Sequence, residues 1–305
     1  MEGQLDTAVP LSGPSVLLRD DAYTALRKLI SRLMAAVVAL SAALVVAIML
    51  IILGYVIVKG LPAINWDFFF DRERSLILGT ERGGGIGPAI QGTLIMLALA
   101  SLLGVPLGIF TAVYLSEFGR GRFATLIRFL VDLLAGFPSI VIGVFVWTVV
   151  VRPRLITDGF SGLAGSIALA IIMVPVVAKT VEEVLRLVPR DLREAALALG
   201  VPTWRTILFV VLPVARNGII TGAILAAARA GGETAPLLLT AGNNRFFNVN
   251  ILEPMASMPV YIYTYTFSPF AVLNERAWGT AMVLIVVIGL LSLLTRLVTG
   301  GKLTR

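Results

Sequence analysis

The chain contains no cysteine and no histidine among its 305 residues. It therefore cannot form disulfide bonds, bind a metal through thiolate or imidazole ligands, or use Cys or His as a nucleophile or base. The glycine-rich run 83–87 lacks the Lys-Ser/Thr pair that a phosphate-binding loop needs, and no Walker-type sequence occurs elsewhere. No set of nucleophile, base and acid converges in the sequence. We therefore expect no metal, no cofactor, no enzyme activity and no ATP hydrolysis by this chain alone.

Charged residues are also scarce. They make up 14% of the chain, whereas 58% of its residues are hydrophobic and the mean hydropathy is +0.94. This composition is typical of a polytopic membrane protein and far from that of a soluble domain. Most of the apolar runs approach or exceed the roughly 20 residues that a helix needs to cross the hydrocarbon core. The sequence predicts an all-α protein with six transmembrane helices, at 33–58, 91–115, 129–150, 163–178, 214–239 and 279–298.

These runs divide the chain into four parts. We expect an amino tail at 1–32, a first span with an external loop at 33–90, a core of five spans at 91–299 and a carboxyl tail at 300–305. The first span is too long for the core of a signal peptide and shows no clear cleavage site, so we expect it to remain as an anchor.

The net charge of +7 indicates membrane orientation rather than nucleic-acid binding, because the basic residues lie in loops without interleaved aromatics. Lys and Arg are concentrated in both tails, after the second span and in the connection 179–213, and are sparser in the other loops. The positive-inside rule therefore places both termini and this connection in the cytoplasm.

The connection 179–213 contains a short, sharply delimited helix. Asp191 is placed to cap the helix and Glu194 to reach back to it, which is the spacing of a capping box. Gly200 provides a stop and Pro202 prevents continuation. The sequence predicts a helix of about two turns at 192–199, with Ala195-Ala196 as a small-residue surface for another protein.

Several spans have the sequence features of helices that pack on one another. Two glycine pairs have the small-xxx-small spacing that allows close backbone approach, and three prolines should bend or interrupt their spans. The glycine pairs are Gly104 with Gly108 and Gly218 with Gly222, and the prolines are Pro106, Pro138 and Pro175.

Arg229 is an ionisable residue deep in the fifth predicted span. It follows Arg216 by 13 residues, which corresponds to about 20 Å of helical rise, and such a group within a membrane is a functional hypothesis by default. Glu233 stands four residues later, and we therefore expect it on the same helix face. Gly231 and Gly232 would loosen that helix. The pair could either hold two spans together or form part of a path for an oxyanion, since a guanidinium matches the oxygens of phosphate.

The connection 179–213 resembles the EAA loop of the permease subunits of bacterial ABC importers. The matching residues are Glu194-Ala195-Ala196, Gly200, the apolar Val210 and Leu212-Pro213. The resemblance implies a type I importer permease fold in which Glu194, Ala195, Ala196 and Gly200 dock on a cytoplasmic ATPase and carry its motion to the spans. ATP binding would close the ATPases and switch the spans to face outward.

Other segments are similar to the permeases of phosphate importers within this family. They are 226–243, with ARAGGETAPLLLT, and 84–97, 134–143 and 253–263, in the expected order. The resemblance places Arg229, Glu233 and Thr234 on the phosphate path. It also implies a bacterial inner-membrane location in contact with lipid. The expected partners are a PstC-like second permease, two PstB-like ATPases and a PstS-like extracytoplasmic phosphate-binding protein.

Two alternatives remain open at this stage. An Arg–Glu pair does not distinguish phosphate from sulfate or molybdate, so the cargo of an ABC permease could be another oxyanion. In a secondary transporter or channel, the same pair would form a gate or a proton relay, and the EAA-like loop would then have no partner.

Overall fold

The computed structural model describes residues 22–72, 84–154 and 157–300. Most of the expected tails at 1–32 and 300–305 lies outside these ranges. The chain forms two compact units, Met1–Tyr55 and Val56–Arg305. The first unit consists of most of α1, Ala22–Gly60, whose side chains are almost all exposed. A helix that is apolar all round is suited to lipid or to a partner helix.

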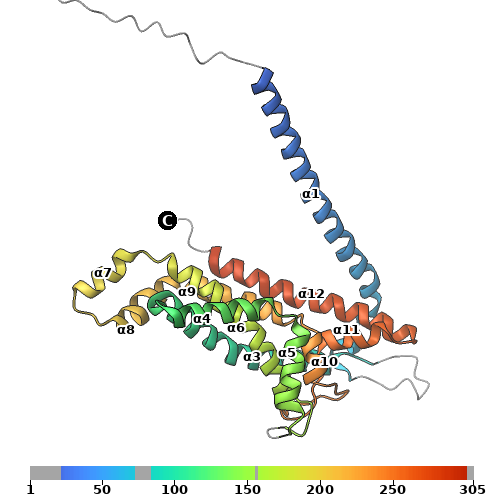
Figure 1. The fold of residues 1–305 in the computed structure, drawn as a ribbon. Coiled ribbons are helices and arrows are strands. Elements are labelled where there is room, and N and C mark those ends of the chain that lie inside the picture. The colour runs from blue at the N-terminus through green and yellow to red at the C-terminus, as the bar shows by residue number, and fades with distance from the viewer. Residues whose placement is uncertain (1–21, 73–83, 155–156, 301–305) are drawn as a thin grey trace, which may run out of the picture. The chain divides into compact units, whose positions relative to one another are not determined.

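The second unit contains the other apolar helices (Figure 1). Its long helices are α3 (Gly87–Val113), α6 (Gly162–Arg186), α9 (Leu212–Ala230) and α12 (Ala271–Gly300). A π-helical turn, η4 (Tyr114–Phe118), extends α3, while α8 (Thr203–Thr206) and η6 (Ile207–Val211) lead into α9. Short helices complete the unit: η2 (Leu61–Ala63), α2 (Trp66–Phe70), α7 (Arg190–Ala198), α10 (Ala235–Thr240) and α11 (Met258–Thr266).

The number of spans agrees with the prediction if one bent pair counts as a single span. In the part of the chain that the structure describes, five helices are long and apolar enough to cross a membrane. The sixth is the pair formed by α4 (Arg122–Gly136) and α5 (Ser139–Val146), which η5 (Trp147–Val151) extends. The pair bends by 103° at Phe137-Pro138. The expected span at 129–150 is therefore this bent pair, and the predicted interruption at Pro138 is confirmed.

The other two prolines do not interrupt their helices. Pro106 lies inside α3 and Pro175 inside α6, and both helices continue past them. A membrane helix tolerates a missing hydrogen bond where neighbouring helices and local adjustments satisfy the freed groups. α6 also extends well beyond the predicted 163–178, into the polar residues before Leu187.

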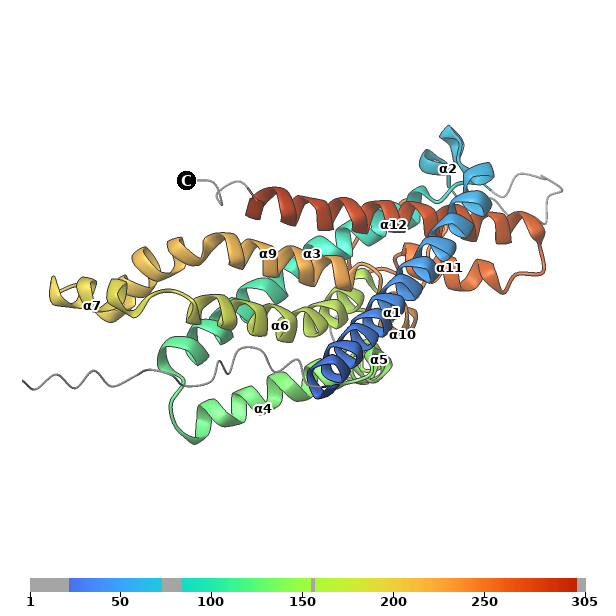
Figure 2. The same cartoon turned by 90° about the horizontal axis from the view of Figure 1, so that it is seen from above.

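α6 packs against both α3 and α9, and the two glycine pairs explain why the helices fit closely (Figure 2). A Cβ on Gly104 would lie 3.0 Å from the carbonyl oxygen of Ala170, and Gly108 meets Val177 in the same way. Further along α6, a Cβ on Gly222 would lie 3.0 Å from Cγ2 of Thr180, and Gly218 contacts Val184. The predicted role of these glycines in packing is confirmed.

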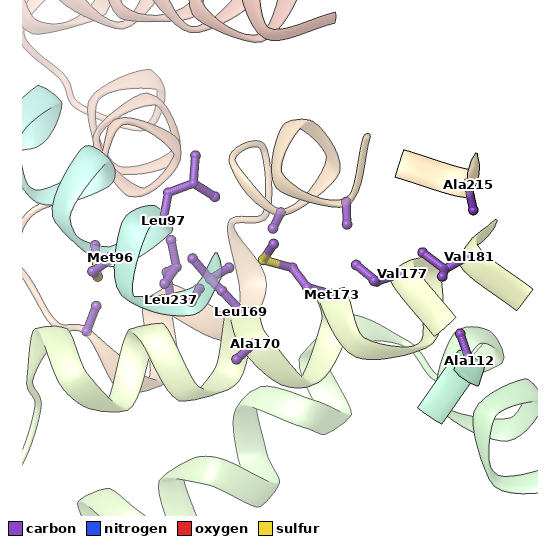
Figure 3. Close-up of a cluster of buried hydrophobic side chains, with 14 of the residues drawn as sticks. Met96, Leu97, Ala112, Leu169, Ala170, Met173, Val177, Val181, Ala215 and Leu237 are labelled. Carbon is purple, nitrogen blue, oxygen red and sulfur yellow. The ribbon is translucent and has the colours of Figure 1, made fainter. Parts of the chain in front are cut away.

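Figure 3 shows the apolar core that these contacts enclose. Leu169, Met173 and Val177 of α6 belong to one cluster with Met96 and Leu97 of α3, and all five are buried. Leu237 from the short helix α10 joins the same cluster. The core therefore fixes α10 relative to α3 and α6, and this positions the segment that follows α9.

Candidate functional site

The helix that carries Arg229 ends immediately after it. α9 stops at Ala230, and Gly232 and Glu233 donate backbone hydrogen bonds to the carbonyls of Arg229 (3.2 Å) and Ala230 (3.1 Å) in a tight turn. The chain then starts α10 at Ala235, with Thr234 at its N-cap position. The predicted continuous span at 214–239 was therefore wrong. Because the helix ends, Glu233 does not share a helical face with Arg229.

A second helix break lies beside the first. α5, which starts after the bend at Pro138, packs against α10, which starts after the break that follows α9. Gly143 allows this contact, because a Cβ on it would lie 2.8 Å from the Cα of Pro236. The two interrupted helices, α4–α5 and α9–α10, therefore contact each other through α5 and α10.

A cavity of about 80 Å³ lies at this junction, and both Arg229 and Glu233 line it. Arg229 is exposed on the surface of the single chain, whereas Glu233 is half-buried. Within the described ranges, no ion pair of 4.0 Å or less joins Arg229 to Glu233. No contact therefore supports the interpretation that the two form a structural ion pair. The remaining lining residues are Leu134, Ala135, Phe137, Ser139, Ile142, Ile172, Pro175 and Val176.

The polar groups of this cavity are of three kinds. Arg229 contributes a permanent positive charge, Glu233 a carboxylate and Ser139 a hydroxyl at the first position of α5. The first turn of α5 has no side-chain cap, and its backbone N–H groups give that end a partial positive charge. Together these groups can attract an anion while Glu233 limits how tightly it is held.

Sequence reasoning placed two of the three expected path residues at this cavity and missed others. Thr234 is half-buried and, among the described residues, is not part of the lining. Ser139 and Pro175 line the cavity but stand far from Arg229 in the sequence. The bend at Pro138 was the available signal for Ser139, because an interrupted membrane helix exposes polar backbone that must line a cavity or contact other protein.

The EAA-like helix is α7, at the opposite end of the second unit from α10 and α11 (Figures 1 and 2). It begins at Arg190 with Pro189 in the N-cap position and no side-chain cap, so the predicted capping box of Asp191 and Glu194 was wrong. Proline suits a helix start because its fixed φ and missing N–H cost nothing there. Asp191 instead lies in the first turn, where a negative charge favours the helix dipole.

The predicted stop at Gly200 is confirmed and takes a specific form. Gly200 has φ of +80°. Its N–H donates to the carbonyl of Leu197 (2.9 Å), and that of Val201 donates to the carbonyl of Ala196 (3.1 Å). These two bonds are the Schellman motif, in which a left-handed residue closes the last turn of a helix.

The surface that α7 presents differs in part from the predicted one. Glu194 and Ala195 are exposed, whereas Ala196 is 9% exposed and packs toward its own chain. The free face also carries Leu197 and Leu199, which are 47% and 84% exposed. A carboxylate beside exposed leucines is a surface suited to contact with another protein.

The comparisons with known proteins agree with this architecture. Residues 104–300 match the family described as "Binding-protein-dependent transport system inner membrane component". The chain is 42% identical over 247 residues to the phosphate transport system permease protein PstA of Haemophilus influenzae, covering 81% of this chain and 85% of that relative. It is 44% identical to PstA of Yersinia pestis, over 72% of this chain and 74% of the relative.

Two solved ABC transporters have a similar fold. One is a bacterial transporter involved in import of the acidic polysaccharide alginate, with a TM-score of 0.61, 16% identity, and coverage of 92% of this chain and 99% of the other. The second is the MetNI methionine transporter, with a TM-score of 0.54, 18% identity, and coverage of 71% and 94%. The fold is that of type I ABC-importer permeases, and the chain belongs to the family of binding-protein-dependent transport system inner membrane components, within it to the PstA permeases.

Proposed function

We propose that this chain is a permease subunit of an ATP-driven importer that moves inorganic phosphate across the bacterial inner membrane. The observation that carries the proposal is Arg229, exposed on the single chain and lining the cavity where two interrupted helices meet. An arginine facing lipid at this depth would be costly. Its exposed face is therefore covered by a second, PstC-like permease, and the two subunits enclose the path between them.

The chemistry of the cavity suits phosphate. The guanidinium of Arg229 donates parallel N–H bonds to two phosphate oxygens and keeps its charge at any relevant pH. Glu233 lines the same cavity and opposes tight binding of an ionised anion, so that phosphate can leave again, as conduction requires. Thr234 stands next in the chain and starts α10, which shapes this end of the path.

The energy comes from partner subunits. In this proposal α7 docks on a PstB-like ATPase through Glu194 and Ala195, while Ala196 and Gly200 hold the shape of the helix. Two such ATPases and a PstS-like extracytoplasmic phosphate-binding protein complete the importer. Both termini and α7 lie in the cytoplasm, as the distribution of Lys and Arg predicts.

Phosphate uptake into proteoliposomes that contain the complete importer tests the role of Arg229. Arg229→Gln keeps a polar side chain but removes the charge, and it should lower ATP-driven uptake by about tenfold or more. This is the effect of losing a charge-assisted hydrogen bond of about 1.5–3 kcal/mol. Unlabelled sulfate and molybdate should compete poorly with labelled phosphate.

The matched control is Arg216→Gln, the same change on the same helix at an exposed position outside the cavity. This variant should transport at the rate of the unmodified importer. If both variants retain the same uptake, Arg229 has only a structural role and the proposed path is wrong. Equal uptake of sulfate would leave the importer role intact but would show that the proposed cargo is wrong.

A further inference from the structure

Arg193 is the residue next to the exposed Glu194, and its side chain turns inward. The guanidinium Nε donates to Oε2 of Glu117 (3.0 Å) and Nη2 donates to Oε1 of the same carboxylate (2.7 Å). Nη1 donates to the carbonyl of Val188 (2.7 Å), and Nη2 also donates to that of Leu185 (2.9 Å). Four of the five N–H groups of the guanidinium are therefore used, in the two-pronged geometry that only arginine provides.

These four hydrogen bonds join three elements. Arg193 belongs to α7 and Glu117 to the π-helical turn that ends α3. The carbonyl of Leu185 lies in the last turn of α6, and that of Val188 lies in the short turn between α6 and α7. The last carbonyls of a helix have no partner within it, and a positive charge there also favours the helix dipole. A single side chain thus connects α7 to the ends of two long helices of the core.

The ion pair is shielded from water to a degree that surface pairs are not. The side chains of Arg193 and Glu117 are 20% and 10% exposed. By contrast, the pair of Lys179 with Asp132, which joins α4 to α6, is 42% and 66% exposed. Exposed pairs contribute little because water and salt screen them, whereas a partly buried pair holds its geometry.

A second set of contacts reinforces the same end of the core. Arg128 of α4 donates from Nε to Glu182 of α6 (3.1 Å) and from Nη2 to the carbonyl of Leu115 (2.8 Å), in the same π-helical turn as Glu117. Arg186 donates to Glu182 as well (2.6 Å). The end of α3 is therefore connected to both α4 and α6, and a force applied at Glu117 reaches all three helices.

We propose that the Arg193–Glu117 pair is the mechanical joint through which motion of α7 reaches α3 and α6, and that it stays closed throughout the transport cycle. The proposal rests on the coupling role of α7 under the proposed function. Glu194 and Arg193 then have different roles: Glu194 contacts the ATPase, and Arg193 contacts the core of its own chain. Both Arg193 and Glu117 are positioning residues and touch neither phosphate nor ATP.

The test measures phosphate moved per ATP hydrolysed by the complete importer in proteoliposomes supplied with phosphate-loaded binding protein. Glu117→Gln keeps the volume of the side chain but removes its charge. It should lower the phosphate moved per ATP at least fivefold while ATP hydrolysis stays within about twofold. Asp132→Asn is the matched control, since it makes the same change in the exposed pair and should leave the ratio unchanged.

Two further variants keep the test decisive if Glu117→Gln does not assemble. Arg193→Lys keeps the positive charge but cannot hold two carboxylate oxygens and two carbonyls at once, so it should lower the ratio similarly. Because the chain has no cysteine, Glu117→Cys with Arg193→Cys can be joined by a short bismaleimide. In a cysteine-free importer this covalent link should restore the ratio that the unlinked double variant loses.

Three results would contradict the proposal that the Arg193–Glu117 pair transmits motion. They are an unchanged ratio in both Glu117→Gln and Arg193→Lys, a fall of uptake and ATP hydrolysis in equal proportion, or a linked double variant that remains uncoupled. Glu194→Lys separates this failure from failure of the proposed function. If Glu194→Lys stops uptake and Glu117→Gln does not, only the joint is wrong. If neither changes uptake, the coupling role of α7 itself is wrong.

Discussion

At the scale of single residues, Gly231 shows that a glycine at a helix break need not cause the break. Its backbone is right-handed, with φ of −63° and ψ of −20°. A Cβ on it would meet the carbonyl of Ala227 at 3.4 Å and Leu97 Cδ2 at 3.6 Å, which are ordinary contacts. Pro236 explains the break better, because in a continued helix its ring would clash with the carbonyl of Gly232.

Gly231→Ala should therefore be accommodated. We expect phosphate uptake within about twofold of the unmodified importer and a stability equal or higher by about 0.4–1 kcal/mol, because alanine reduces the entropy of the unfolded chain. Gly143→Ala is the contrasting variant, since its Cβ would lie 2.8 Å from the Cα of Pro236, and it should lower the melting temperature. Thermal unfolding and uptake of both variants check this, and a Gly231→Ala variant that melts as early as Gly143→Ala contradicts it.

The same residues mark how far the sequence could predict the site. A charge deep in an apolar span is a strong local signal, and the two residues that it indicated, Arg229 and Glu233, both line the cavity. Their predicted relative placement was wrong, because it depended on where α9 ends, and Pro236 prevents the helix from continuing. For Ser139 the sequence offered only the bend at Pro138, because its place beside Arg229 depends on how α5, α6 and the end of α9 pack together.

At the scale of elements, the Schellman motif at Gly200 is a separable part of α7. Gly200 has φ of +80° and open space around its missing side chain, so a substitution there is opposed by backbone strain alone. Gly200→Ala should cost about 1–2 kcal/mol locally, fray the last turn of α7 and lower the phosphate moved per ATP several-fold. Transport ratios measured in proteoliposomes check this expectation.

Gly289→Ala provides the control for that element. Gly289 also has open space around it but lies inside α12 without a positive φ, so alanine should leave coupling unchanged and slightly favour the helix. Equal effects of the two variants would show that the left-handed turn after α7 is not what matters. A loss confined to Gly200→Ala would tie coupling to the shape of that turn.

Helices were easier to predict than their ends. Long apolar runs identified every long helix, because length and composition decide membrane insertion. The start of α7 was misplaced because two signals competed, and Pro189 prevailed over the side-chain cap expected from Asp191. Pro138 marked a break in advance, but the size of its 103° bend and the continuation past Pro106 and Pro175 depend on neighbouring helices, which one sequence does not reveal.

At the scale of the whole molecule, the fold class and the number of spans could be predicted from composition. The surfaces that contact a partner could not be predicted in this way. The exposure of Arg229 became visible only when the helices were packed together. By contrast, α1 could be identified as a span from its length and apolar composition alone.

The sidedness of the chain remains a prediction from its charges, and the absence of cysteine makes it directly testable. Leu199 and Val249 are 84% and 74% exposed, and they lie at the two ends of the core, beside α7 and in the loop after α10. In spheroplasts, Val249→Cys should react with a membrane-impermeant maleimide. Leu199→Cys should react only after the membrane is opened, because the proposed function places α7 in the cytoplasm. Labelling of Leu199→Cys from outside would invert the topology and remove α7 from the reach of any cytoplasmic partner.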